Sequence, residues 1–346
     1  PPIQCGCFRP LQSLSCLFGG SPIRKRGFSI TDGATTARLI LQSTLKRSVQ
    51  FTGIGLHSAS SVTLIIHPAD VGFGLQIRRT DVKDGGYGFA AHWTCVSHSP
   101  LCTRLVNDEG VSISTVEHVM AALAGCGVHN ALIELNGPEA PILDGSAVPF
   151  VQEILAAGVR PQNVPVTVFK VLKTVEFRCD SGWARLAPAD TLQMDFHIDF
   201  EDAAIGSQSK TLNLANGAFV RELCDSRTFC RQSDVEMMRA NGLALGGTLH
   251  NAVVVDGESV LNPGGMRYSD EPVRHKMLDA LGDLALAGAP IIGHYTGVRA
   301  GHAITNNLLR ELFTVPGAVE KVQCTPAMLA CLPGVGVTEQ EIPKSA

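Results

Sequence analysis

Hydrophobic and polar residues alternate with helical spacing between Pro272 and Ala287. His275, Asp279 and Asp283 recur at every fourth position, so they form a polar stripe along one side of the predicted helix. The other side carries the hydrophobic residues Met277, Leu278, Leu281, Leu284 and Ala285. Acidic residues before Pro272 and a glycine after Ala287 are typical of helix boundaries, which supports one helix over the whole segment.

The remaining pattern of the chain predicts strands and short helices in an order that occurs twice. Strands are predicted at Lys46–His57, which enters a glycine-marked turn, and at Ser61–His67, Asn130–Leu135, Val166–Phe177, Trp183–Leu186, Leu192–Phe200 and Ile291–Val298. Further helices are predicted at Ser114–Ala124, Pro149–Ala157, Asn216–Cys224 and His302–Leu312. In each half, strands precede a helix with a histidine near its start, and a glycine and another strand follow.

This shared order predicts an α+β fold made of two similar domains, each a β-sheet layered with helices. If helices of the two domains pack face to face, His118 comes toward His275 and an active site lies between the domains. We expect the N-terminal domain over residues 37–164 and the C-terminal domain over residues 165–323. Residues 324–346 are expected to be a flexible tail.

The first residues differ in composition from the rest of the chain. From Pro1 to Thr31 there is no Asp or Glu, whereas there are four basic residues and four Ser. This composition is typical of an organellar transit peptide, and residues 24–29 resemble a mitochondrial processing site. We therefore expect residues 1–36 to be a transit peptide or disordered, with a mature start between Phe28 and Thr36 in the mitochondrial matrix. An ordinary basic tail is the alternative, with another organelle or the cytoplasm as the location.

The composition of the 346 residues is that of a globular protein, since 45% are hydrophobic and 17% are charged. A net charge of −4 provides no general attraction to nucleic acid or to anionic membranes. No run of apolar residues approaches the roughly 20 that a membrane-spanning helix needs, so no transmembrane segment is expected. The 11 cysteines are irregularly spaced, which favours reduced and mostly buried thiols in a reducing compartment.

The polar stripe carries candidate metal chemistry. His275 and Asp279 lie about one helical turn apart, so an imidazole and a carboxylate face the same side and can bind one divalent cation. His118, which follows Glu117, supplies a further ligand. Two His, one Asp and an unused Glu are the parts of a catalytic zinc site with an open position. The alternatives are a solvated helix face, on which Asp279 pairs with a Lys or Arg, and a capping box between Ser114 and Glu117.

Two other residues are candidates for the same chemistry, and each has a structural alternative. Thr228, which precedes a long apolar segment, could donate a hydrogen bond to a developing oxyanion or serve only in packing. His302 stands at a predicted junction between a loop and a helix, where it could be a general acid or a neighbour of the helix cap.

Seven segments together give the chain a resemblance to the zinc-dependent UDP-3-O-acyl-N-acetylglucosamine deacetylases of lipid A biosynthesis. The segments are Thr52–His57, Leu101–Thr103, Ile113–His118, Pro141–Ser146, Ser226–Phe229, Arg274–Asp283, and Gly301–His302 with Asn306–Asn307. They occur in the expected order. The N-terminal extension is not part of the bacterial pattern, so the resemblance is to an organellar form of such an enzyme.

The resemblance implies a role for each residue of the candidate metal site. His118, His275 and Asp279 correspond to the zinc ligands, with water in the open position and Fe²⁺ as the alternative metal. Glu117 corresponds to the general base that activates this water. His302 corresponds to the cationic histidine that stabilises the oxyanion and protonates the leaving amine.

The resemblance also implies groups that assist these residues and bind the substrate. Asp283 would orient His302, as a carboxylate behind a functional histidine does, and Thr228 would polarise the acetyl carbonyl. Lys276 would face the sugar or the diphosphate, and Asp199–Phe200 would help to bind UDP. The predicted reaction is hydrolysis of the acetamide, which releases acetate and a free glucosamine amine.

An insert at Cys230–Asp256 matches the family's passage for the acyl chain. Leu101, Cys102 and Phe229 are expected at the substrate site, with Cys102 near the metal but not a ligand. The expected partner is a small UDP-sugar lipid, with peripheral membrane contact and a monomeric chain, and not nucleic acid. A zinc amidohydrolase for another acylated amine and a non-catalytic α+β binding protein are the alternatives.

Overall fold

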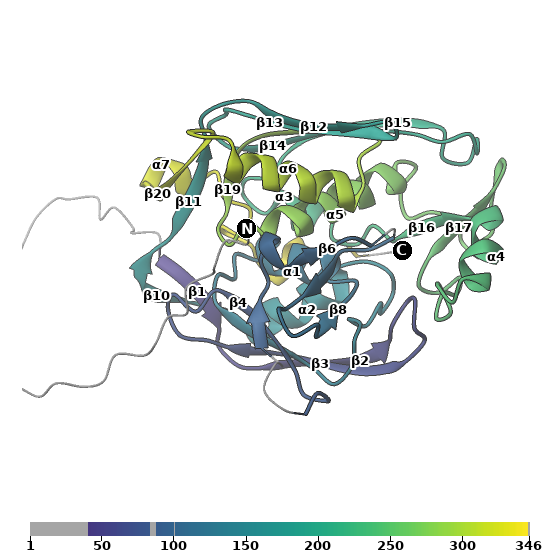
Figure 1. Ribbon diagram of the computed structural model, residues 1–346, viewed down its shortest axis with the longest axis horizontal. Helices are drawn as coiled ribbons and strands as arrows, with labels where there is room; N and C mark the ends of the chain where they lie inside the picture. Colours follow the sequence, from purple (N-terminus) through teal and green to yellow (C-terminus); the bar gives the residue numbers. More distant parts are fainter. Residues whose placement is uncertain (1–40, 84–87, 100, 345–346) are drawn as a thin grey trace, which may run out of the picture. The chain divides into compact units, whose positions relative to one another are not determined.

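The computed structural model describes residues 41–83, 88–99 and 101–344, which belong to one compact unit. The predicted transit peptide, residues 1–36, lies outside the described residues. Within the described unit, two sheets enclose two layers of helices (Figure 1). No helix in these ranges is long and apolar enough to cross a bilayer.

The N-terminal half is built on a five-stranded sheet. Its strand order is β2 (Val49–Ile54), β3 (Ser61–Pro68), β9 (Ala131–Leu135), β4 (Leu75–Arg79) and β5 (Gly88–Ala90). β3 pairs antiparallel with β2 and β9, whereas β4 runs parallel to β9. Val62, Leu64 and Ile66 alternate along β3 and are buried. The helices α1 (Glu117–Gly125) and α2 (Val148–Ala157) lie on the inner side of this sheet (Figure 1).

The C-terminal half is built on a seven-stranded sheet. Along its main path the order is β12 (Val175–Cys179), β13 (Gly182–Ala187), β19 (Ile291–Val298), β11 (Thr167–Val171) and β20 (Val319–Gln323). β14 (Leu192–Asp199) pairs with β19 and with β15 (Ser207–Asn213). The helices α3 (Ala218–Glu222), α5 (Glu271–Ala285) and α6 (His302–Thr314) belong to this half. α5 and α6 lie on the inner side of the sheet (Figure 1).

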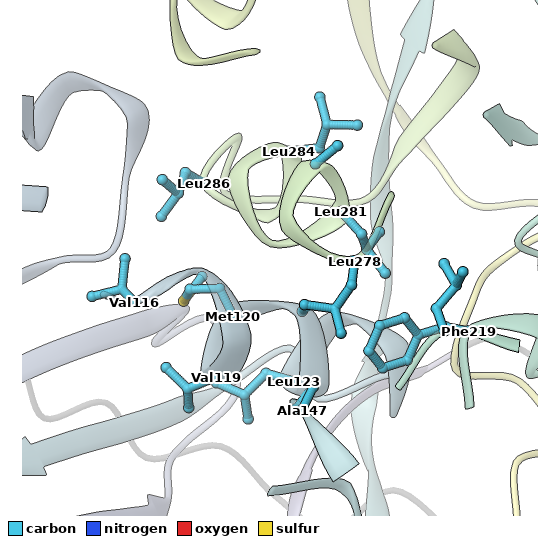
Figure 2. Packing of buried hydrophobic residues seen from close by; sticks show 14 of the residues in the cluster. Val116, Val119, Met120, Leu123, Ala147, Phe219, Leu278, Leu281, Leu284 and Leu286 are labelled. Carbon is cyan, nitrogen blue, oxygen red and sulfur yellow. The ribbon is translucent and has the colours of Figure 1, made fainter. Parts of the chain in front are cut away.

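The two halves meet where α1 packs against α5. α1 is buried along almost its whole length, as expected for a helix with apolar residues on every side. Figure 2 shows Leu278 and Leu281 of α5 pointing toward α1 and toward the ring of Phe219. A Cβ atom at Gly282 would lie 2.0 Å from the carbonyl oxygen of Glu117, so the two backbones touch at this glycine. The predicted α+β fold, with helices of two similar halves packed face to face, is therefore confirmed.

Smaller elements complete the described fold. β1 (Leu41–Leu45) pairs with β10 (Val159–Pro165), and a three-stranded sheet contains β6 (Val96–Ser97), β7 (Arg104–Val106) and β8 (Ser112–Ile113). A second three-stranded sheet contains β16 (Phe229–Arg231), β17 (Val253–Asp256) and β18 (Ser259–Val260). β16 and β17 are parallel, and α4 (Gln232–Ala240) lies between them in the sequence. The predicted insert is therefore a β-α-β unit.

Two predicted elements differ from the structure. Val166–Phe177 forms two strands rather than one, because the N–H groups of Leu172 and Lys173 both donate to Ala318 O and turn the chain between β11 and β12. The helix predicted from Ser114 begins at Glu117 instead. β15 was not predicted, since its residues are mostly polar and it lies at an edge of the sheet with little to bury.

The expectation of a flexible tail at residues 324–346 is wrong for the described residues up to 344. Leu332 is buried with Val166, Val168 and Ile292, which belong to the C-terminal sheet or lie beside it. A Cβ atom at Gly334 would lie 2.1 Å from the backbone nitrogen of Gly127, so this segment also packs closely against the end of α1. The segment includes the short helix α7 (Pro326–Leu329). Its sequence lacks a regular hydrophobic period, which is why the packing was not predicted.

Candidate active site

Three predicted ligands come together where α1 meets α5. One ligand atom from each of His118, His275 and Asp279 lies within 4.8 Å of the others, and all three side chains are buried. The Nε2 atoms of His118 and His275 lie 3.7 and 3.3 Å from Asp279 Oδ1. That oxygen is buried and accepts no hydrogen bond, which is costly for a carboxylate unless a cation binds it. Two imidazoles and a carboxylate at this spacing fit a zinc ion with an open coordination position.

The two histidines are held in the form that binds a metal. Nδ1 of His275 donates to the carbonyl oxygen of Ser226 at 2.9 Å, so its Nε2 is left free to face the cluster. Burial lowers the pKa of His118 to about 3, and burial also lowers the pKa of His275 below its ordinary value. Both rings are therefore neutral at pH 7, as metal coordination requires.

Glu117 is the carboxylate beside this cluster. Its Oε2 accepts a hydrogen bond from the backbone N–H of Thr103 at 3.0 Å. The capping-box alternative is wrong, because α1 has no side-chain cap and the N–H of Ser114 donates to Pro138 O instead. Burial raises the pKa of Glu117 to about 7, against the opposing effect of the His302 imidazole. A carboxylate with this pKa can take up a proton near neutral pH.

His302 faces Glu117 from the first turn of α6. Its Nε2 lies 3.6 Å from Glu117 Oε1 and 3.8 Å from Asp279 Oδ2. Its Nδ1 lies 3.0 Å from Asp283 Oδ2, so this carboxylate accepts from the ring. Burial opposes the cationic form, but the carboxylates of Asp283, Glu117 and Asp279 outweigh it and raise the pKa of His302 to about 9. His302 is therefore a cation at pH 7 that can donate a proton.

A cavity of about 790 Å³ opens onto these groups. Glu117, His118, Asp279, His302 and the predicted carbonyl-polarising Thr228 form one part of its lining. The predicted substrate residues Leu101, Phe200, Phe229 and Lys276 form another. The insert contributes mainly apolar lining, which includes Val235, Met237, Met238, Leu249 and Val254. A polar reactive centre is thus continuous with an apolar channel wall, as expected for a site that binds an amphiphilic molecule.

Three predicted residues occupy positions that the sequence did not indicate. Nζ of Lys276 lies 2.8 Å from Asp279 Oδ2, so its ammonium group pairs with a cluster carboxylate while lining the cavity. Asp279 does pair with a Lys, as in the alternative of a solvated helix face. This face of α5 is buried, however, and not solvated. Asp199 is exposed at the end of β14 and does not line the cavity. Cys102 lines a smaller adjoining pocket, and burial raises the pKa of its thiol to about 11.

Several residues around the site were missed by sequence reasoning. The Thr103 hydroxyl donates to Asp283, and Ser226 O orients His275. His57 lines the cavity, and its Nδ1 accepts from Ala244 N at 3.3 Å. These contacts join residues that are 180, 49 and 187 positions apart, so no local spacing could indicate them.

The chain is similar to proteins of one enzyme family. A model of the family described as UDP-3-O-acyl N-acetylglycosamine deacetylase matches residues 42–314. Proteins named UDP-3-O-acyl-N-acetylglucosamine deacetylase from Shewanella frigidimarina and Shewanella sp. (strain W3-18-1) are 44% and 45% identical to the chain over 286 residues. Each alignment covers 82% of this chain and 93% of the relative. The matched region includes every residue of the cluster and of the cavity lining named above.

Proposed function

The chain belongs to the family of UDP-3-O-acyl-N-acetylglycosamine deacetylases, and we propose that it hydrolyses the acetamide of UDP-3-O-acyl-N-acetylglucosamine. The products are acetate and the UDP-3-O-acyl-glucosamine with a free amine, a step of lipid A biosynthesis. The observation that carries this proposal is the buried group of His118, His275 and Asp279, with Glu117 and His302 beside it. Metal ligands, a base and an acid thus line one cavity.

The metal site has residues of the right type for zinc. A zinc ion held by His118, His275 and Asp279 would supply Lewis-acid chemistry, since it polarises an amide carbonyl and makes water more acidic. Burial alone would raise the pKa of the Asp279 carboxyl, but the charges of Lys276 and of the His302 cation lower it and keep Asp279 ionised. The carboxylate is therefore charged and ready to bind a cation at neutral pH.

Glu117 and His302 divide the proton transfers between them. Glu117 accepts the proton of the attacking water, for which its pKa of about 7 is suited. The cationic His302 stabilises the negative charge that develops on the acetyl oxygen, and then gives its proton to the leaving amine. Thr228 lines the same cavity, and we assign its hydroxyl to the acetyl oxygen as a further donor. The buried position of these groups strengthens each electrostatic interaction.

The volume and lining of the cavity suit a UDP-sugar with an acyl chain. We assign Lys276, Phe200 and Phe229 to the sugar and nucleotide, and Leu101 and Cys102 to the side that adjoins the smaller pocket. The apolar lining of the insert is assigned to the acyl chain. Each buried CH₂ group contributes about 0.8 kcal/mol, so the acyl chain supplies much of the substrate affinity.

Acetate release from matched substrates tests this function against the alternatives. We expect the zinc-loaded protein to release acetate from UDP-3-O-acyl-N-acetylglucosamine, and far less from UDP-N-acetylglucosamine, which lacks the acyl chain. Equal rates on both would favour an amidohydrolase for another acylated amine. Absence of zinc binding and of acetate release would favour a non-catalytic binding protein.

The location and association of the chain are proposed on other grounds. The acid-free, basic composition of residues 1–31 supports import into the mitochondrial matrix, with cleavage before Thr36. Sequencing the N-terminus of protein purified from mitochondria tests this, and a protein that still contains residues 1–27 would contradict it. We also propose a monomer, because one chain supplies all residues of the proposed site. A further proposal is peripheral membrane contact during substrate uptake. Light scattering and vesicle sedimentation test these two points.

A further inference from the structure

Thr103 joins three elements of the active-site region through its polar groups. It lies directly before β7 and is only 1% exposed. Its N–H donates to Glu117 Oε2 at 3.0 Å, and its carbonyl accepts from the N–H of Val116 at 3.4 Å. Its hydroxyl donates to Oδ1 of Asp283 on α5. One residue of the N-terminal half thus contacts both the proposed base and the carboxylate behind His302.

The direction of the Thr103 hydroxyl is set by Asn306. The Nδ2 of Asn306 donates to Thr103 Oγ1 at 3.3 Å and to the carbonyl of His302 at 2.9 Å. Because the amide group occupies a lone pair of the hydroxyl oxygen, the single hydroxyl proton remains for Asp283, which can only accept when ionised. The chain of donors therefore runs from Asn306 through Thr103 to Asp283.

This chain of hydrogen bonds fixes the second oxygen of Asp283 as well. Oδ1 is occupied by Thr103, so Oδ2 faces Nδ1 of His302 at 3.0 Å. A ring that donates from Nδ1 presents Nε2 to the cavity, where it lies 3.6 Å from Glu117 Oε1. Glu117 is itself held by the Thr103 N–H. The relative position of the two proton-transferring groups thus depends on one residue outside their helices, which acts through its backbone N–H on Glu117 and through its hydroxyl on Asp283.

We propose that Thr103 is a positioning residue for the deacetylation, in which its hydroxyl aligns the Asp283–His302 pair and its N–H aligns Glu117. This inference rests on the proposed function. Thr103 does not line the cavity, and none of its contacts among the described residues reaches His118, His275 or Asp279. Loss of the hydroxyl should therefore affect turnover rather than substrate affinity or metal content.

A matched pair of variants tests this inference. Thr103→Val removes the hydroxyl and keeps the shape and the backbone N–H, whereas Thr103→Ser keeps the hydroxyl and removes a methyl group. Loss of a partner behind a functional group typically costs about 10–100-fold in activity, so we expect Thr103→Val to lose kcat by this factor. KM and zinc content should stay within about twofold of the wild type, and Thr103→Ser should retain most of kcat. A Thr103→Val enzyme with wild-type kcat, or a Thr103→Ser enzyme as impaired as Thr103→Val, would overturn the proposal.

A double-mutant cycle tests whether the hydroxyl acts through Asp283. In an Asp283→Ala background the hydroxyl has lost its acceptor, so adding Thr103→Val should lower kcat little further. An equal loss of kcat in both backgrounds would contradict the proposed route.

If Thr103→Val does not fold, Thr103→Ala removes the same hydroxyl without the added methyl, and the same outcomes decide. A wild-type protein that released no acetate would overturn the proposed function, and this inference with it. If the wild type is active and Thr103→Val has the same kcat, only the positioning role would be overturned.

Discussion

At the scale of single residues, Glu117, His275 and one oxygen of Asp279 each have a partner, whereas the other oxygen of Asp279 accepts no hydrogen bond. Glu117 accepts from the Thr103 N–H, and His275 donates to Ser226 O. Asp279 Oδ2 pairs with Lys276, whereas Oδ1 has no partner and faces the two imidazoles. Since buried polar atoms are rarely left unpaired in proteins, Oδ1 identifies the position of the cation within the cluster.

Removal of one ligand should abolish metal binding. We expect His275→Ala to contain less than one tenth of the wild-type zinc after dialysis, because only two protein ligands remain. His294→Ala is the matched control, since His294 pairs with Asp195 at a partly exposed position of β19 outside the cavity lining. Metal analysis by mass spectrometry measures both. A His275→Ala protein with one zinc per chain would show that the cluster is not the metal site.

Loss of the Thr228 hydroxyl should slow the chemical step. If this hydroxyl donates to the developing oxyanion, Thr228→Val should lower kcat about 10²–10³-fold, as found when one such donor is removed. Thr228→Ser keeps the donor and should retain most of the activity. Acetate release under saturating substrate measures the difference, and an unchanged kcat for Thr228→Val would mean that Thr228 only lines the cavity.

The metal-binding residues could be predicted from the sequence, whereas their supporting contacts could not. His275 and Asp279 share a helix, so a spacing of four residues already places their side chains on one side. Thr103 and Asp283 meet across 180 residues, and only the packing of α1, α5 and α6 brings them together. The resemblance contained Thr103 within a matching segment but gave it no role.

At the scale of elements, the close approach of α1 and α5 determines where the catalytic groups lie. Gly282 allows the backbone of α5 to touch Glu117 O, one helical turn after Asp279.

The periodic helices were predicted well, because their apolar sides are regular. The edge strand β15 and the segment after Gln323 were not, because their burial depends on partners far away in the sequence.

A methyl group at Gly282 should disturb both stability and catalysis. Gly282→Ala would place Cβ 2.0 Å from Glu117 O, so the two helices must separate. Overpacking of this kind costs about 1–3 kcal/mol in unfolding free energy, and kcat should fall because Glu117 moves. At Gly88 the nearest atom lies 3.8 Å from an added Cβ, so Gly88→Ala is the control. Urea unfolding and acetate release measure the effects, and wild-type stability in Gly282→Ala would contradict the contact.

At the scale of the whole molecule, the metal site joins the two halves. His118 belongs to α1 in the N-terminal half, whereas His275 and Asp279 belong to α5 in the C-terminal half. A cation that binds this cluster binds only the folded protein, since unfolding separates the ligands. Metal binding should therefore stabilise the fold of both halves together.

Zinc should raise the thermal stability of the protein. Free zinc at 100 times its Kd adds about 2.7 kcal/mol of stability, which corresponds to a rise in Tm on the order of 5 °C. Dialysis against a chelator should lower Tm by this amount, and returning zinc should restore it. His275→Ala should show no such response. A zinc-dependent Tm in His275→Ala would place the stabilising ion elsewhere in the protein.

The most direct test of the account is acetate release by zinc-loaded wild type and Glu117→Gln on UDP-3-O-acyl-N-acetylglucosamine. Glu117→Gln keeps the size and the acceptor oxygen of the side chain but cannot take up a proton. We predict one zinc per chain in both proteins, one acetate per substrate consumed by the wild type, and a kcat lowered about 10²–10⁴-fold in the variant. A wild type that binds zinc but releases no acetate, or a Glu117→Gln variant with wild-type kcat, would contradict the account.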